Sequence, residues 1–161
     1  MSAIINVGMA EIKITVSPHR LVSTGLGSCI GLCLYDPVSK VGGMAHIVLP
    51  ALTGFAGLDQ GGKYAVTAIP LLVENMLKFG ANRYRITAKM AGGAEMFIFQ
   101  GEEPILKIGE RNAETVKEIL DDAGIPLLAA EVGGNFGRTI LFDTETGELL
   151  VKTVNYGERI I

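Results

Sequence analysis

The chain has 161 residues, with 17 acidic and 14 basic side chains and a formal net charge of −3. With 48% hydrophobic and 19% charged residues, its composition is that of a folded protein, and we expect a single domain spanning residues 1–161. It has no basic cluster suited to a nucleic acid, and no apolar run reaches the roughly eighteen residues that a membrane span needs. Cys29 and Cys33 lie four residues apart in one expected strand, and no secretory signal is recognised, so we expect a reducing, cytoplasmic setting.

The first half of the chain is dominated by strand patterns. Residues 10–16 alternate well enough for a strand, which the Ser-Pro pair that follows ends. Two apolar runs, residues 29–35 and 41–49, then flank the sequence Asp-Pro-Val-Ser at 36–39. Asp at the first position and Pro at the second are typical of a type I turn, so these runs are predicted to form an antiparallel hairpin.

The register of this hairpin decides which side chains meet. With the turn centred on its Pro-Val pair, Cys29 faces His46 directly. Opposed residues have Cβ atoms about 4.5–5.5 Å apart, close enough for a thiol and an imidazole to exchange a proton. A β-bulge at the Gly42-Gly43 pair is the alternative that would shift the pairing. The predicted core face holds Ile30, Leu32, Leu34, Val41, Ala45, Ile47 and Leu49, and the other face holds Cys29, Gly31, Cys33, Gly42, Met44 and His46.

The middle of the chain predicts a loop followed by a helix. Residues 50–62 contain a proline and several glycines and are predicted to form a mobile loop. Residues 63–79 carry apolar side chains at helical spacing, and Gly80 is expected to end the helix. Pro70 inside this helix predicts a kink, because proline removes one backbone hydrogen bond.

The second half of the chain predicts one more helix among strands. A strand is expected over residues 83–90, and a helix over residues 111–123 with Asn112 as its N-terminal cap. Two helices and about seven strands favour an α+β fold, a layered α/β sandwich in which two main helices pack on a mostly antiparallel or mixed sheet. The last three predicted strands are residues 127–132, 138–143 and 149–154.

Cys29 and His46 together predict a cysteine nucleophile with its general base. The histidine would take the thiol proton and later return it to the leaving group. A third group must orient the imidazole, and Ser23 and Thr24 are the nearest hydroxyls in the sequence. This set of groups suits acyl transfer on an amide, an ester or a thioester, through a thioester on the cysteine.

The glycine-rich bend before Cys29 is predicted to supply the oxyanion site. Gly25 and Gly27 allow positive φ angles, which can turn backbone N–H groups inward. The N–H groups of Gly27, Ser28 and Cys29 are the expected donors to a tetrahedral intermediate.

The remaining reactive side chains have simpler interpretations. Cys33 is expected to be a small buried residue, and His19, beside a proline in a turn, a solvated loop residue. A zinc site built from Cys29, Cys33, His46 and His19 is an alternative. However, two cysteines four apart on a strand do not form the short knuckle that structural zinc uses, so we expect no metal ion and no organic cofactor.

A set of short motifs extends along almost the whole chain. It begins with Gly-Leu-Gly-Ser-Cys at 25–29 and Met-Ala-His-Ile-Val-Leu-Pro at 44–50. It continues with residues 62–65, 88–94, 96–97, 108–109, 111–112, 133–135 and 137–138. Each motif alone is weak, but the set, in this order, resembles the CheD family of chemoreceptor glutamine deamidases.

The resemblance implies a layered α/β fold with a triad of cysteine, histidine and a hydroxyl residue. Cys29 would attack the side-chain amide of glutamines on chemoreceptor signalling helices, release ammonia and leave a glutamate after hydrolysis. Some members resemble methylesterases in activity, and many bind the phosphatase CheC, so a CheC-type phosphatase is an implied partner. Where the family usually has threonine, this chain has Ser23, which keeps the hydroxyl, with Thr24 one residue later.

The sequence leaves two alternatives to a receptor deamidase open. One is a non-enzymatic binding module that regulates a CheC-type phosphatase, and the other is a cysteine hydrolase of small molecules. A deamidase of a helical protein needs an open site. We therefore expect the glycines at 25 and 27, 92 and 93, and 133 and 134 to form a shallow rim, and Phe55 and Leu58 to contact the partner helix.

Overall fold

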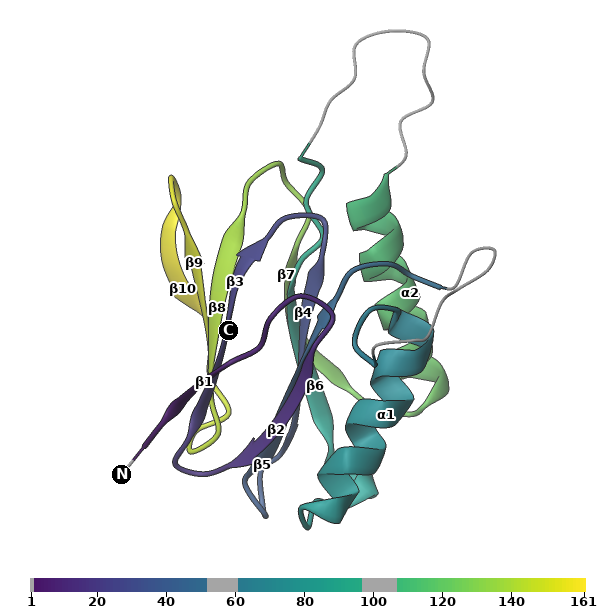
Figure 1. Cartoon of the computed structure of the whole chain (residues 1–161), viewed down its shortest axis with the longest axis vertical. Coiled ribbons are helices and arrows are strands. Elements are labelled where there is room, and N and C mark those ends of the chain that lie inside the picture. The colour runs from purple at the N-terminus through teal and green to yellow at the C-terminus, as the bar shows by residue number, and fades with distance from the viewer. Residues whose placement is uncertain (1, 52–60, 97–106) are drawn as a thin grey trace, which may run out of the picture.

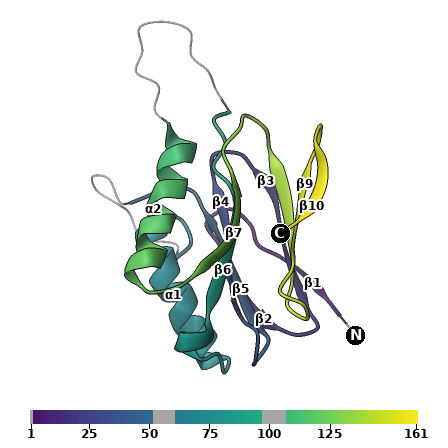
Figure 2. The same cartoon turned by 180° about the vertical axis from the view of Figure 1, so that it is seen from behind.

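Two five-stranded β-sheets stack face to face, and two α-helices cover the far side of one of them (Figure 1). The computed structural model describes residues 2–51, 61–96 and 107–161. We call the helix-covered sheet the central sheet; its strand order is β2 (Ile12–Val16), β5 (Val41–Ile47), β4 (Ile30–Asp36), β6 (Thr87–Gly92) and β7 (Leu127–Val132). The other, the outer sheet, has the order β1 (Ile4–Asn6), β3 (Arg20–Leu26), β8 (Arg138–Asp143), β9 (Leu149–Thr153) and β10 (Gly157–Ile160). The helices are α1 (Ala65–Lys78) and α2 (Ile108–Asp122), and the view from behind shows both on the same side of the central sheet (Figure 2).

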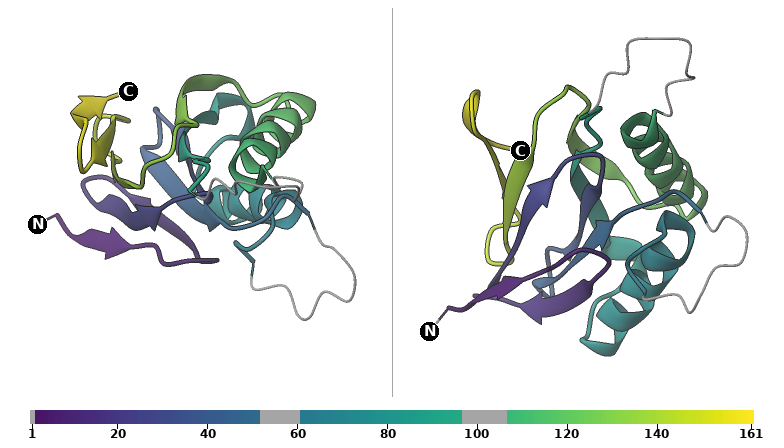
Figure 3. Two further views of the ribbon diagram at one scale, coloured as in Figure 1. Left: turned by 90° about the horizontal axis from the view of Figure 1, so that it is seen from above. Right: turned by 45° about the horizontal axis from the view of Figure 1, so that its top comes forward.

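Strands β4 and β5 of the central sheet are buried on both faces, and the view from above shows the helices and the outer sheet on opposite sides of this sheet (Figure 3). One hydrophobic cluster lies on its helix side, where Leu32 packs with Leu72 of α1 and Val116 of α2. The second cluster lies between the sheets and contains Met44 and Ile140. The two faces predicted for the hairpin are confirmed, since the strand residues of its core face all point to the helices. The opposite face is buried too, because the outer sheet covers it.

The predicted hairpin exists, but its register is wrong by two residues. Asp36 pairs with Val41, so the turn contains four residues instead of two. Lys40 adopts a left-handed conformation with φ 56°, and its N–H donates to the Asp36 carbonyl at 2.8 Å. His46 consequently lies opposite Gly31, not opposite Cys29. The longer turn causes the shift, because β4 and β5 pair without a bulge at the two glycines.

The first predicted helix is confirmed and the start of the second is wrong. Pro70 lies inside α1, and Gly80, with φ +103°, follows its end as predicted. In contrast, α2 begins three residues before Arg111, so Asn112 is an interior, fully buried residue and not a cap. Residues 52–60 of the predicted loop, with Phe55 and Leu58, lie outside the described residues.

The α+β class is confirmed, although the chain has more strands than predicted. Three strands were not anticipated: β1 and β10, which are short, and β3, whose glycines and hydroxyls do not resemble a strand. Residues 83–85 form a 3₁₀ turn, and the strand expected there begins only at Thr87. Across the described residues, no helix is long and apolar enough to cross a membrane.

Candidate active site

Ser23 and His46 approach each other across the space between the two sheets. Ser23 lies on β3 of the outer sheet and His46 on β5 of the central sheet, and their exposed fractions are 0% and 3%. Ser23 Oγ is 2.9 Å from His46 Nδ1. The backbone of the histidine is held as well, since its N–H donates to Glu11 and its carbonyl accepts from Ala10.

The carbonyl of Val7 determines which imidazole nitrogen carries the proton. Ser23 Oγ donates to the Val7 oxygen at 2.8 Å, because a carbonyl oxygen can only accept. Since the hydroxyl has one proton, Ser23 must accept the hydrogen of His46 Nδ1–H in the other contact. The neutral imidazole then has its lone pair on Nε2, which is buried without a partner among the described residues. This is the tautomer that a general base needs.

Cys29 lies in the segment that carries the chain from the outer sheet to the central sheet. β3 ends at Leu26 and β4 begins at Ile30, so residues 27–29 form the bend between the sheets. The cysteine is 7% exposed and belongs to the cluster between the sheets. Because Gly31 is the residue opposite His46, Cys29 lies two residues along the chain from that pair, just beyond the last pair of the two strands, Ile30 with Ile47.

Burial favours the neutral forms of both groups. It raises the pKa of the Cys29 thiol, an effect that the residue's own backbone N–H partly offsets. Burial lowers the pKa of the His46 imidazole, while the Val7 carbonyl acts in the opposite direction. Burial therefore favours a thiol and a neutral imidazole in the resting site, because desolvation penalises the thiolate and the imidazolium alike.

Three hydrogen bonds fix the carbonyl groups of the bend. Each donor lies just after β6 or on α2, at 2.9 Å from its acceptor: Ala94 N–H to Gly27 O, Asn112 Nδ2 to Ser28 O, and Gly93 N–H to Cys29 O. The N–H groups of these three bend residues donate to no oxygen of the described chain. Unpaired N–H groups beside a nucleophile are the donors that an oxyanion requires.

Glycines allow the backbone segments around Cys29 to approach closely. Gly25 has φ +68°, as predicted, whereas Gly27 does not adopt a positive φ. A Cβ on Gly92 would lie 2.1 Å from the Cys29 carbonyl oxygen, so no other residue fits there. The Gly133 N–H donates to the Gly92 carbonyl at 3.0 Å. The three glycine segments singled out in the sequence therefore meet beside Cys29.

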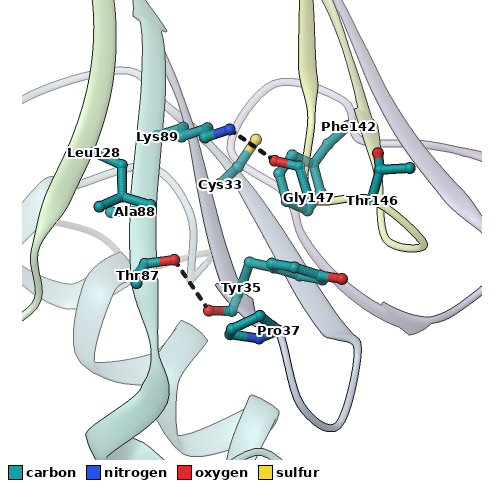
Figure 4. Close-up of a pocket in the computed structure, with 10 residues that line it drawn as sticks. All are labelled: Cys33, Tyr35, Pro37, Thr87, Ala88, Lys89, Leu128, Phe142, Thr146 and Gly147. Carbon is teal, nitrogen blue, oxygen red and sulfur yellow. Dashed lines mark hydrogen bonds between the residues drawn. The ribbon is translucent and has the colours of Figure 1, made fainter. Parts of the chain in front are cut away.

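The second cysteine lies in a different environment. Cys33, 1% exposed as expected, lines a pocket of about 190 Å³ near the turn between β8 and β9. Figure 4 shows its sulfur and the ammonium group of Lys89 in the same part of this pocket. Lys89 Nζ donates to the carbonyls of Gly147 and Ile161, both at 2.9 Å. Burial raises the pKa of Cys33 well above the usual thiol value, and no histidine lines the pocket.

The other candidate residues are not brought to this site. Thr24 is exposed and its hydroxyl is not bonded to His46, so Ser23 is the hydroxyl residue that contacts the histidine. His19 immediately precedes β3, four residues before Ser23, and its Nδ1 accepts from the Ala3 N–H at 3.0 Å. In the part of the chain that the structure describes, no three His, Cys, Asp or Glu residues are grouped as a metal ion would require.

Two residues at the site were not identified from the sequence. Val7 contributes only a backbone carbonyl, which no side-chain pattern reveals. Asn112 stands in a recognised motif, but its expected role as a helix cap concealed its contact with the bend. The sequence does indicate that Asn112 faces the core, because Val116, four residues later, lies on the same face of the helix.

Comparisons with known proteins identify the family of this chain. Residues 48–153 match the family described as "CheD chemotactic sensory transduction". The probable chemoreceptor glutamine deamidase CheD of Desulfitobacterium hafniense strain DCB-2 is 57% identical, over the full length of both chains. A protein of the same name from Syntrophomonas wolfei is 53% identical over the full length of both chains. Another, from Clostridium botulinum strain Hall, is 46% identical over 98% of this chain and 97% of its own length. With these matches, the chain belongs to the CheD family.

Proposed function

We propose that this chain deamidates glutamine side chains of chemoreceptors, with Cys29 as nucleophile, His46 as general base and acid, and Ser23 as the orienting hydroxyl. The observation that carries the proposal is the buried Ser23–His46 bond, which leaves Nε2 unprotonated and without a partner among the described residues. Its relatives' names supply the reaction, since they are called probable chemoreceptor glutamine deamidases.

The reaction begins with transfer of the Cys29 proton to His46 Nε2. The sulfur attacks the carbon of the side-chain amide, and the N–H groups of Gly27, Ser28 and Cys29 stabilise the oxyanion that forms. His46 then donates its proton to the amide nitrogen, and the C–N bond breaks to release ammonia. His46 Nε2 then takes a proton from a water molecule, which attacks the thioester. Collapse of the second intermediate breaks the C–S bond and releases glutamate, and His46 returns its proton to the Cys29 sulfur.

The neutral resting pair suits this sequence of events. A permanent thiolate would be open to oxidation and alkylation, whereas a buried thiol becomes nucleophilic only as its proton moves to the base. The raised pKa of Cys29 and the lowered pKa of His46 both oppose a preformed thiolate–imidazolium pair, so the proton is proposed to move only as the sulfur attacks.

The proposed substrate is a glutamine on the surface of a receptor helix in the cytoplasm. Gly25 and Gly133 support an open rim, because a Cβ on either residue would meet nothing within 4 Å. We further propose a CheC-type phosphatase as a partner and methylester hydrolysis as a secondary activity, since the thioester route accepts esters as well as amides.

The direct test is the mass of a receptor fragment incubated with the protein. Each deamidation adds about one dalton, because an amide NH₂ is replaced by OH. We expect the wild type and the matched control Cys33→Ala to produce this change and Cys29→Ala to produce none. Conversion by Cys29→Ala would disprove the assignment of the nucleophile. A wild type that binds a CheC-type phosphatase but never converts the fragment would instead favour the binding-module alternative.

A further inference from the structure

Asn112 joins the two segments that carry the proposed nucleophile and base. The residue is fully buried in the second turn of α2. Its Nδ2 donates to the Ser28 carbonyl and to the Val48 carbonyl, both at 2.9 Å. Because both partners are carbonyl oxygens, which only accept, the orientation of the amide is determined. Ser28 immediately precedes Cys29, and Val48 lies two residues after His46.

The amide bridges a place where the sheet no longer holds its strands together. The last pair between β4 and β5 is Ile30 with Ile47. Beyond this pair the two segments form hydrogen bonds with other parts of the chain, because the Val48 N–H donates to Lys63 and the Cys29 carbonyl accepts from Gly93. The side chain of Asn112, on helix α2, therefore links the two segments where hydrogen bonds between β4 and β5 no longer do so.

The remaining oxygen of this side chain is buried without a partner among the described residues. An unpaired buried oxygen opposes folding, whereas an apolar residue would leave the Ser28 and Val48 carbonyls without this donor. The asparagine therefore pairs two carbonyls at the expense of its own oxygen. What the amide provides, and an apolar residue does not, is a fixed spacing between the Ser28 and Val48 carbonyls.

We propose that Asn112 is a positioning residue, which sets the separation of Cys29 from His46 by holding both strand ends. This proposal rests on the proposed function of these two residues. Loss of the two hydrogen bonds would let the bend move away from β5, so proton transfer would weaken while receptor binding would not. Small displacements of this kind reduce turnover by up to about 10²-fold.

The test compares two variants of Asn112 with a matched variant of the same helix. Asn112→Ala removes both donors, and Asn112→Asp keeps the size but presents oxygens to two carbonyls. Val116→Ala, four residues on and fully buried, removes packing without touching either strand end. Thermal unfolding of each protein is measured first. The kcat and KM for a receptor fragment and the pH dependence of Cys29 alkylation by iodoacetamide are then measured below the lowest unfolding temperature.

We expect both Asn112 variants to lower kcat by about tenfold or more at unchanged KM, and to displace the alkylation profile. Val116→Ala should keep kcat and the alkylation rates within about twofold of the wild-type values, while it loses at least as much thermal stability as the Asn112 variants. Asn112 variants that match Val116→Ala in kcat and alkylation would overturn the proposal. Variants that fold at no temperature would do the same, since Asn112 would then be a structural residue. Alkylation needs no receptor, so this result is separable from failure of the deamidase assignment.

Discussion

The two ends of the β4–β5 hairpin differ in how completely their buried polar groups are hydrogen-bonded. At the turn, both oxygens of the Asp36 carboxylate are satisfied. Arg85 donates to them through Nε and Nη2, at 3.0 Å each, and the N–H groups of Val38 and Asn82 donate at 2.9 and 2.8 Å. At the open end, His46 is bonded through Nδ1 alone, and its Nε2 has no partner in the described chain.

This difference separates a group that stabilises the fold from one that is available for chemistry. Burial alone would raise the pKa of Asp36, but the Arg85 guanidinium and the N–H groups of Asn82 and Val38 hold it far below its ordinary value, so its charge is locked. The half-paired imidazole has a pKa lowered by burial and can still gain a proton at Nε2. The comparison predicts that changes at the turn alter stability, whereas changes at the open end alter turnover.

The largest effect is expected from His46→Gln. Glutamine cannot accept the thiol proton, so turnover of a receptor fragment should fall by about 10³-fold, within the usual contribution of a general base. The unfolding temperature should change little, since Nε2 makes no bond in the described chain. The measurement is the initial rate of conversion by intact mass, with His19→Gln as the control. A His46→Gln protein that retains a tenth of the wild-type rate would contradict the role of the base.

The next largest effect is expected from removing the Asp36 carboxylate at the turn. Asp36→Ala leaves the N–H groups of Val38 and Asn82 unpaired, and we expect it to lower the free energy of unfolding by about 3 kcal/mol. Chemical denaturation at neutral pH measures this loss. Glu74→Gln, which breaks an exposed pair with Lys78, should cause little change. Turnover per folded molecule should stay near that of the wild type.

The contribution of Asp36 should also disappear in acid. Because its folded pKa is depressed, the stabilisation is present above the unfolded carboxyl pKa of about 3.9 and is lost as the pH falls further. The stability difference between the wild type and Asp36→Ala should therefore narrow below about pH 4. A difference that is constant from neutral to acid pH would show that the carboxylate charge is not what stabilises the turn.

A smaller effect is expected from Ser23→Ala. The imidazole would lose its acceptor, but Nδ1–H can turn to the nearby Val7 carbonyl, so turnover should fall by only about tenfold. Thr24→Ala is the matched control, because that hydroxyl is exposed and adjacent in sequence. If Thr24→Ala lowered the rate more than Ser23→Ala, the orienting hydroxyl would have to be reassigned.

The sequence was sufficient for the parts of this site that depend on local patterns. The alternation of β4 and β5 indicated the two faces correctly, and a glycine-rich bend beside Cys29 indicated where backbone segments meet. It was insufficient for the register, because the length of the turn depends on Lys40 adopting a left-handed conformation, which lysine rarely does. Since a two-residue error preserves the face of every side chain, the chemistry was predicted from an incorrect pairing.

The contacts between the sheets could not be predicted. The bond from Ser23 to His46 needs β3 to lie in a second sheet, and the sequence of β3 does not resemble a strand. Val7 O is a backbone atom positioned by the pairing of β1 with β3. Resemblance to a family suggested the serine, but only the stacking of two sheets explains how it reaches the imidazole.

The smallest predicted effect concerns the resting state of the open end. A thiol whose pKa burial has raised should be alkylated slowly at neutral pH, and the rate should keep rising beyond the pH at which a free thiol levels off. Mass spectrometry of the Cys29 peptide after short iodoacetamide pulses measures this profile, with Cys33→Ala as the background to remove the other thiol. Cysteine–histidine sites that rest as an ion pair give a rate that is already constant near neutrality. An alkylation rate that is already constant near neutral pH would mean that His46 holds the proton before substrate arrives. The open end of the hairpin would then carry a permanent ion pair, and its contrast with Asp36 would not hold.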